Sequence, residues 1–239
     1  MRIDRLLVER GLFESRARAQ AAVAAGLVRV DGVVVAKPAQ DVADDACIEA
    51  SDVHGFVSRG GLKLEAGLRA FGIEVAGRVA LDVGASTGGF TDVLLRQGAR
   101  HVFAVDVGRD QFHASLRGRR EVSVMEETDI RTLDRAAIPV PVGLVVVDVS
   151  FISLRQVLPA ALAFAASHAR LVALVKPQFE AGRAALKKGI VRDPQVREVV
   201  CAAAADLVTG LGWRVMGLVP SPIAGGDGNV EYLLGAERP

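Results

Sequence analysis

The sequence lacks most features of a secreted, membrane-bound or metal-binding protein. None of its apolar stretches reaches the roughly 18 residues that a membrane span needs. The first residues, Met1 to Arg5, already carry charges and so lack the apolar core of a signal peptide. The two cysteines, Cys47 and Cys201, lie far apart and without metal-ligand spacing. We therefore expect a cytoplasmic protein with no disulfide and no metal site.

What the sequence does contain is enough apolar material for a core, since 51% of its 239 residues are hydrophobic. This length suits a large domain with a small companion. The net charge is only +1, but residues 1–37 carry seven basic and four acidic side chains, whereas residues 41–52 carry five acidic and no basic ones. We therefore expect the basic segment to be a separate unit.

The N-terminal unit is expected to contain two helices and a hairpin. Apolar residues recur at helical spacing from Ile3 to Gly11, and a second helical stretch runs from Ser15 to Gly26. β-branched runs flank Asp31-Gly32, a pair typical of a type I′ turn. Arg16 and Arg18 stand at the start of the second helix, where the helix dipole already supplies positive charge. That placement favours a phosphate site, with an ordinary solvated arginine pair as the alternative.

This segment resembles the S-four RNA-binding domain, named after the fourth protein of the small ribosomal subunit. The resemblance rests on residues 2–4, 6–7, 15–19 and 26–32 and covers residues 1 to about 50. The module occurs on RNA-modifying enzymes and ribosome-associated proteins, so it implies a structured RNA partner. The arginines that the resemblance assigns to RNA contact are Arg2, Arg5, Arg16 and Arg18.

From Val79 onward, apolar runs alternate with helical stretches, which is typical of a parallel sheet with helices on both faces. The pattern predicts a doubly wound α/β fold of the Rossmann-like type. The predicted strands are Val79–Val83, Val102–Val107, Leu144–Val147, Leu171–Val175, Arg214–Val219 and Val230–Leu234. The predicted helices are Gly89–Gln97, Ser153–Ser167 and Val196–Thr209.

The first of these strands leads into a glycine-rich turn, and ligands of such folds bind at the carboxyl ends of strands. The glycines at 84, 88 and 89 have the wrong spacing for the dinucleotide fingerprint, which disfavours a nicotinamide cofactor. Asp106 could accept ribose hydroxyls and Asp129 an adenine amino group, although each could also be a simple turn residue. Together they predict an S-adenosylmethionine pocket. Its residues are Asp82, Gly84, Ala85, Ser86, Thr87, Gly88, Gly89, Phe90, Asp106 and Asp129.

Four charged residues are expected to meet beside this pocket. Asp148 follows the predicted strand Leu144–Val147 and Lys176 the predicted strand Leu171–Val175, and Glu231 joins them if the last strand runs antiparallel. Lys63 lies on a helix that begins near Ser58 and could overhang the pocket. Surface ion pairing is the alternative interpretation.

These stretches closely resemble the TlyA family of rRNA 2′-O-methyltransferases, which are relatives of the FtsJ-type enzymes. The matching residues are 57–64, 81–91, 147–154, 174–180 and 228–232, so the resemblance spans nearly the whole chain. It implies an RNA-binding domain at 1–50, a linker at 51–57 and a methyltransferase domain at 58–239. It also implies S-adenosylmethionine as cofactor and ribosomal RNA or ribosomal subunits as partner, with a cytidine ribose as the target. The family's catalytic Lys-Asp-Lys-Glu tetrad carries over onto Lys63, Asp148, Lys176 and Glu231.

The chemistry of ribose methylation fits this tetrad. A ribose hydroxyl is a poor nucleophile at neutral pH, so its proton must leave as the methyl group arrives. Lys176 can take the proton as a neutral amine if burial, Lys63 and the positive sulfur favour its uncharged form. If Asp148 and Glu231 favour the charged form, Lys176 instead stabilises the developing alkoxide, and an aspartate or water takes the proton. The sequence leaves both roles open.

The basic loop at 183–192 is a further candidate for RNA contact, with a solvated loop as an equal alternative. The additional RNA-binding candidates are Arg59, Lys187 and Lys188.

Three other functions fit parts of the sequence. An inactive methyltransferase-like domain could act in ribosome assembly, but every tetrad position is filled. The haemolysin label that TlyA-family members often carry suggests membrane activity, but no amphipathic or spanning segment supports it. A small-molecule methyltransferase would have no use for a basic RNA-binding unit. The residues specify neither the modified nucleotide nor the oligomeric state.

Overall fold

The computed structural model describes residues 1–13, 15–51, 55–225 and 228–239. The chain divides into two compact units, Met1–Gly55 and Phe56–Pro239, and each has its own hydrophobic core. The expected linker at 51–57 overlaps residues 52–54, which lie outside the described residues.

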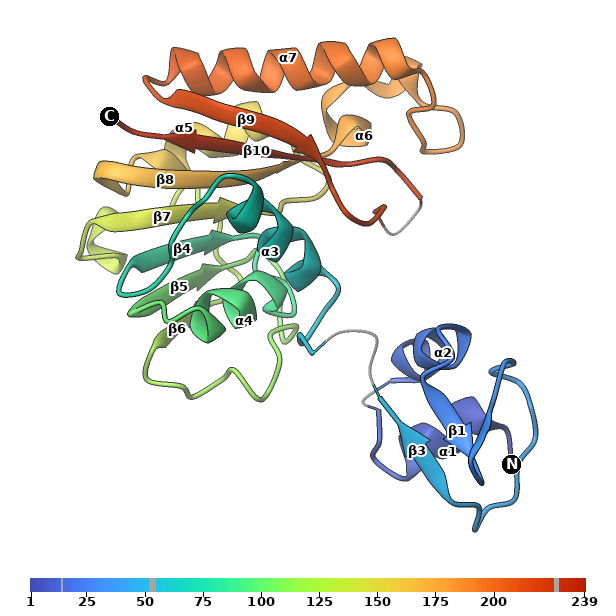
Figure 1. Ribbon diagram of the computed structural model, residues 1–239. Helices are drawn as coiled ribbons and strands as arrows, with labels where there is room; N and C mark the ends of the chain where they lie inside the picture. The colour runs from blue at the N-terminus through green and yellow to red at the C-terminus, as the bar shows by residue number, and fades with distance from the viewer. Residues whose placement is uncertain (14, 52–54, 226–227) are drawn as a thin grey trace. The chain divides into compact units, whose positions relative to one another are not determined.

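The N-terminal unit packs two helices against a three-stranded antiparallel sheet (Figure 1). Its helices are α1 (Ile3–Glu9) and α2 (Arg16–Ala24), and its strands are β1 (Val28–Val30), β2 (Val33–Val34) and β3 (Ile48–Ala50) in the order β2-β1-β3. The two helices and the hairpin are confirmed. The sequence did not predict β3, because it is only three residues long, incompletely buried and next to an acidic stretch.

The turn between β1 and β2 has the backbone that the Asp31-Gly32 pair predicts. Both residues have positive φ, 49° and 79°, as a type I′ turn requires. The predicted cap of the second helix also forms, because the Ser15 side chain accepts a hydrogen bond from the Arg18 backbone N–H at 3.4 Å.

The large unit is built on a seven-stranded sheet with the order β6-β5-β4-β7-β8-β10-β9. Within this sheet the paired strands from β6 to β8 are parallel, and β10 runs antiparallel to both of its neighbours, β8 and β9. The predicted α/β fold with an antiparallel last strand is therefore confirmed. The strands are β4 (Val79–Val83), β5 (His101–Val105), β6 (Val122–Met125), β7 (Val142–Val147), β8 (Ala165–Val175), β9 (Arg214–Pro220) and β10 (Tyr232–Glu237).

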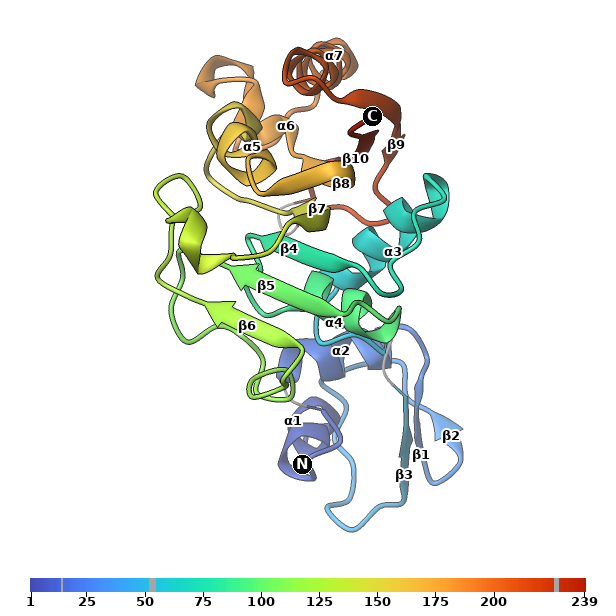
Figure 2. The same cartoon turned by 90° about the vertical axis from the view of Figure 1, so that its left-hand side faces the viewer.

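Helices cover both faces of this sheet, so its central strands are buried on both sides (Figure 2). The helices α3 (Gly60–Ala70) and α4 (Gly89–Arg96) pack on one face, and α5 (Leu154–Leu162) and α7 (Pro194–Gly210) on the other. The unit is completed by the short α6 (Pro177–Glu180) and two single 3-10 turns, η1 (Arg135–Ala137) and η2 (Arg183–Ala185).

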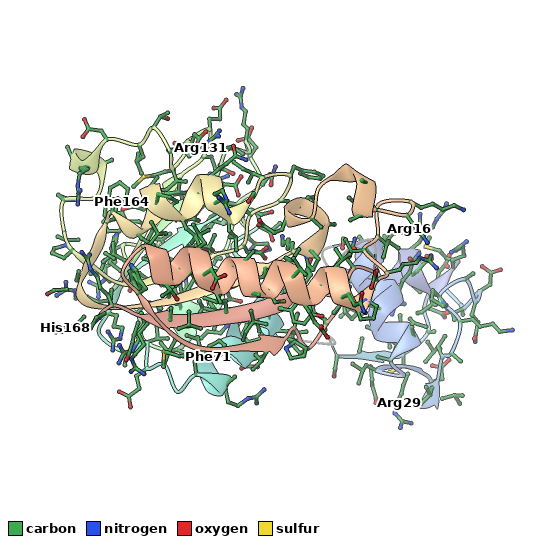
Figure 3. The ribbon with its side chains drawn as sticks, turned by 90° about the horizontal axis from the view of Figure 1, so that it is seen from above. Arg16, Arg29, Phe71, Arg131, Phe164 and His168 are labelled. Carbon is green, nitrogen blue, oxygen red and sulfur yellow. The ribbon has the colours of Figure 1, made fainter. Side chains whose placement is uncertain are left out.

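The last two strands pack between α7 and Phe71. Seen from above, α7 runs along β9 and β10 (Figure 3). Phe71 belongs to the core on the other face of the sheet. A Cβ at Gly235 of β10 would lie 2.4 Å from the Phe71 ring, so glycine lets this ring press against the sheet. The packing fixes β10, and with it the residues that precede this strand.

Several predicted element boundaries were wrong. The helix expected to end at Ser167 ends at Leu162, and β8 begins at Ala165 rather than Leu171, because the polar residues in its first half concealed a strand that is only partly buried there. Strand β5 ends at Val105, so Asp106 lies in the following loop. Strand β10 begins at Tyr232, so Glu231 precedes the strand instead of lying within it.

Candidate active site

The four candidate catalytic residues come from one edge of the sheet and from α3. Asp148 directly follows β7, and Lys176 directly follows the neighbouring parallel strand β8. Because β10 is antiparallel, its first residue Tyr232 pairs with Val175 at the end of β8. Glu231 is therefore brought to the end of the sheet at which Lys176 follows β8, and Lys63 of α3 contacts Glu231 there.

These residues form two close ion pairs. Lys63 Nζ donates a hydrogen bond to Glu231 Oε2 at 2.5 Å, and Lys176 Nζ lies 2.5 Å from Asp148 Oδ1. Lys176 Nζ also donates to the Ser150 hydroxyl at 3.0 Å. The side chains of Lys63, Lys176 and Glu231 are at most 11% exposed. Charges this buried are stable only when paired, so the pairs are part of the folded structure.

A cavity of about 280 Å³ opens beside these pairs. Lys63, Asp148 and Lys176 line it, whereas Glu231 does not and meets it only through Lys63. The opposite wall comes from the glycine-rich turn after β4 and from Arg59 at the start of α3. Two amines and a carboxylate thus face one small space.

A second cavity of about 440 Å³ lies beyond the carboxyl ends of β4, β5 and β7. It shares Gly84, Ser86, Asp148 and Ser150 with the first cavity, so the two meet at these residues. A space of this size suits a nucleoside-sized ligand. The arrangement gives a larger pocket that opens onto the charged pairs.

Glycine is required where the turn passes Asp148. Gly84 has a φ of 83°, and a Cβ there would lie 2.3 Å from the Asp148 carbonyl oxygen. Gly88 serves packing instead, since a Cβ there would lie 2.7 Å from the Leu116 side chain.

Eight of the ten predicted cofactor residues line one or both cavities, and Asp82 and Gly88 line neither. The lining residues are Gly84, Ala85, Ser86, Thr87, Gly89, Phe90, Asp106 and Asp129.

Asp106 and Asp129 both border the second cavity, but their carboxylates have different hydrogen-bond partners. Asp106 accepts hydrogen bonds from the backbone N–H groups of Ser86 and Gly108, both at 2.7 Å, so its carboxylate is fixed at the cavity wall. Asp129 is bound by the guanidinium of Arg131, whose hydrogen bonds lower the pKa of Asp129. A ligand would meet Asp106 directly but would share Asp129 with Arg131.

Asp82 lies beneath the glycine-rich turn rather than on a cavity wall. It is fully buried, and its Oδ2 accepts a hydrogen bond from the Thr91 hydroxyl at 2.7 Å. Burial, with a smaller effect from Asp148, raises its pKa to about 7. Its position favours a structural contribution over ligand contact.

Comparison with known proteins identifies the family to which each unit is similar. The FtsJ-like methyltransferase family matches residues 56–238, and the S4 domain family matches residues 1–45. The chain is 48% identical over 236 residues to the 16S/23S rRNA (cytidine-2′-O)-methyltransferase TlyA of Mycobacterium tuberculosis, covering 98% of this chain and 88% of the relative. The chain belongs to the TlyA family of FtsJ-like methyltransferases.

Other TlyA-family relatives carry a different kind of name. The chain is 39% identical to Hemolysin A of Brachyspira hyodysenteriae, over 98% of each protein. A solved structure from Streptococcus thermophilus, also called a hemolysin, has a TM-score of 0.79 and 41% identity and covers 100% of this chain and 88% of that chain. No helix in the described part of the chain is long and apolar enough to cross a membrane.

The RNA-binding candidates of this TlyA-family chain differ in their exposure and in their contacts with other side chains. Arg2 and Arg16 both bind the buried carboxylate of Asp4, with Arg16 Nη2 at 3.0 Å from Asp4 Oδ2. Arg5 is exposed, and so are Lys187 and Lys188. At the phosphate site expected at the start of α2, the Arg16 guanidinium is therefore partly engaged by Asp4.

Sequence reasoning missed two side chains at the site. Ser150 lines both cavities and binds Lys176. Phe151 is 91% exposed, has a φ of 64° and contacts Phe179 with the ring centroids 5.0 Å apart and the rings tilted by 52°. Both stood in the family motif, but neither a serine nor a phenylalanine after a strand has a pattern that predicts a role.

Proposed function

We propose that this protein transfers a methyl group from S-adenosylmethionine to the 2′-hydroxyl of a cytidine ribose in ribosomal RNA. The observation that carries the proposal is the pair of buried ion pairs, Lys63–Glu231 and Lys176–Asp148, beside a cavity that continues into a nucleoside-sized pocket. The relative that is 48% identical and named for this reaction supports the choice of substrate. A ribosomal substrate places the reaction in the cytoplasm.

The second cavity fits the nucleoside part of the cofactor. Gly84 leaves backbone rather than a side chain at the junction of the cavities, and the Asp106 carboxylate is held in place to accept ribose hydroxyls. When bound, S-adenosylmethionine supplies an electrophilic methyl group on a positively charged sulfur. Asp148 and Ser150, which border both cavities, stand where the two parts of the site meet.

Lys176 is the side chain that we assign to the reacting hydroxyl. As a neutral amine, Lys176 Nζ has two N–H bonds, directed to Asp148 and Ser150, and one lone pair left for the substrate hydroxyl. The lone pair takes the proton released by the hydroxyl, and the resulting ammonium is paired with the Asp148 carboxylate. Lys63, which lines the cavity, helps to orient the sugar, and Glu231 balances the charge of Lys63 from behind it.

The basic side chains of the N-terminal unit would hold structured RNA through its phosphates, as the S4 match supports. Arg5 and the exposed parts of Arg16 and Arg18 are the contacts that we assign to this unit. Arg59, Lys187 and Lys188 are the contacts that we assign to the large unit. Firm binding matters because holding donor and hydroxyl together supplies much of the rate.

The proposal is tested by mapping ribose methylation on ribosomal RNA from cells with and without this protein. Cells that carry Lys176→Ala should lose the mark, while calorimetry on the purified variant shows nearly unchanged binding of S-adenosylmethionine. Loss of a group that handles the proton should lower the rate by about 10²–10⁴-fold. Identical methylation maps with and without the protein would refute ribosomal RNA as the substrate.

Lys176→Arg separates the two roles that a lysine can have here. Guanidinium keeps the positive charge but cannot give up its proton in a protein. We expect this variant to be as inactive as Lys176→Ala in a methyl-transfer assay. Substantial residual activity would instead make Lys176 a purely electrostatic group, with Asp148 as the proton acceptor.

A further inference from the structure

The basic loop at 183–192 ends in a tight turn. Lys187 and Ile190 exchange both backbone hydrogen bonds, at 3.0 and 3.2 Å. Between them, Lys188 and Gly189 have φ values of 54° and 79°, a backbone that lysine rarely adopts. Lys187 and Lys188 are both exposed. The turn therefore holds two positive side chains at a defined place on the surface.

A single buried side chain anchors this turn. Asn229 is 1% exposed, and its Nδ2 donates a hydrogen bond to the Gly189 carbonyl at 3.0 Å. Its Oδ1 accepts a hydrogen bond from the Val191 N–H at 3.1 Å. A buried amide is costly unless both of its polar atoms are bonded, so these two contacts fix the turn against the segment that carries Asn229.

That segment leads directly to the candidate catalytic glutamate. Asn229 precedes Glu231 by two residues, and the Glu231 carbonyl is itself fixed by the Ser221 N–H at 2.8 Å. A Cβ at Gly225 would lie 2.5 Å from Glu231 Oε1, so the surrounding backbone is packed tightly against the carboxylate. The loop that carries the turn and the segment before β10 lie at the same end of the sheet (Figure 1). Asn229 therefore links the turn directly to the segment that carries Glu231.

We propose that Asn229 is a positioning residue that couples RNA binding at Lys187 and Lys188 to the Lys63–Glu231 pair. The inference rests on the proposed function, because it takes RNA phosphates as the ligand of the two lysines. RNA held by the turn sets the position of Asn229 and hence of Glu231. The turn thereby contributes to the rate of methyl transfer as well as to affinity.

A double-mutant cycle tests this coupling. The four proteins are the full chain, the pair Lys187→Ala with Lys188→Ala, Asn229→Ala, and all three changes together. Each is assayed for methyl transfer from labelled S-adenosylmethionine to ribosomal RNA, and kcat and the KM for RNA are measured separately. Unfolding temperatures are recorded, and Asn229→Asp, which keeps the acceptor for Val191 but loses the donor to Gly189, replaces Asn229→Ala if that variant does not fold.

We expect removal of the lysines to lower kcat/KM by about tenfold, through kcat as well as KM, and to reduce the dependence of log KM on log salt by about one per lysine. In the Asn229 background the same removal should cost less than about twofold, because the coupling is already broken. The matched control removes two exposed bases at the amino-terminal edge of the sheet, Arg100→Ala with Arg120→Ala, and should change neither constant.

Additive effects in the cycle, or a change in KM alone on removing the lysines, would overturn the inference while leaving the proposed function intact. A full chain that methylates no RNA would instead overturn the proposed function. An Asn229 variant that loses only thermal stability and keeps the full response to the lysines would assign Asn229 a structural role.

Discussion

Lys63 Nζ and Glu231 Oε2 lie 2.5 Å apart, although 168 residues separate them in the sequence. Glu231 is 3% exposed and the Lys63 side chain 11%. The contact joins α3 to the segment before β10 and so ties the start of the large unit to its end. Because neither ion has enough water around it to be stable alone, each depends on the other.

Breaking this pair should cost stability as well as activity. We expect Glu231→Gln to lower the free energy of unfolding by about 3–5 kcal/mol, because it leaves a buried ammonium without its counterion. The double variant Lys63→Met with Glu231→Leu should recover most of that loss but stay inactive. Urea unfolding at 25 °C and a methyl-transfer assay measure the two effects. Wild-type stability in the single variant would show that the pair is solvated.

Asp106 and Asp129 provide a matched test of cofactor binding. Asp106→Ala should weaken S-adenosylmethionine binding by about 10–100-fold, because a carboxylate held by two backbone N–H groups is lost from the cavity wall. Asp129→Ala should have a smaller effect, since Arg131 already occupies that carboxylate. Isothermal titration with S-adenosylmethionine gives both constants. An equal or larger loss at Asp129 would contradict the geometry.

The sequence predicted the architecture because the central strands are buried on both faces. Largely apolar runs such as Val79–Val83 and Leu144–Val147 stand out because both sides of these strands are covered. Once the strands are placed, the rule that ligands bind at their carboxyl ends puts Asp148 and Lys176 together. Glu231 required the additional assumption of an antiparallel last strand, which the structure confirms.

What the sequence could not predict depends on contacts between distant residues. The partial burial of the first half of β8 follows from its neighbours in the sheet, not from its own pattern. Asp4 gave no sign that it would be buried and would bind Arg2 and Arg16. The position of Asp82 beneath the glycine-rich turn likewise follows from the packing of Thr91.

The contacts of Asp4 lead to different expectations for Arg5 and Arg16. Arg5→Ala should weaken binding of ribosomal RNA without affecting stability, because Arg5 is exposed. Arg16→Ala should also destabilise the N-terminal unit by about 1 kcal/mol, since Arg2 and Gln20 still bind Asp4 and the lost pair is half exposed. Filter binding measures affinity, and hydrogen exchange of α1 and α2 measures local stability. Faster exchange in Arg5→Ala would argue against this division.

The raised pKa of Asp82 should make the free energy of unfolding depend on pH in a range where the carboxyl groups with lowered pKa values do not titrate. Burial raises this pKa from 3.8 to about 7, so between these values the folded protein keeps a proton that the unfolded chain has lost. The contribution of Asp82 to the free energy of unfolding is therefore complete below pH 3.8 and is lost as the pH rises through 7, with a slope of at most about 1.4 kcal/mol per pH unit.

A carboxyl group whose pKa is lowered by folding makes the free energy of unfolding fall as the pH falls, and it does so at lower pH than Asp82. Arg117 lowers the pKa of Glu126 from 4.5 to about 2, so its contribution is lost only as the pH falls below about 4.5. Measurements from pH 5 to 7 therefore report mainly on Asp82. Urea unfolding followed by the fluorescence of the buried Trp213 should show stability falling over this range. Asp82→Asn, which still accepts the Thr91 hydrogen bond but does not titrate, should flatten the slope, and equal slopes in both proteins would show that Asp82 is already ionised in the folded state.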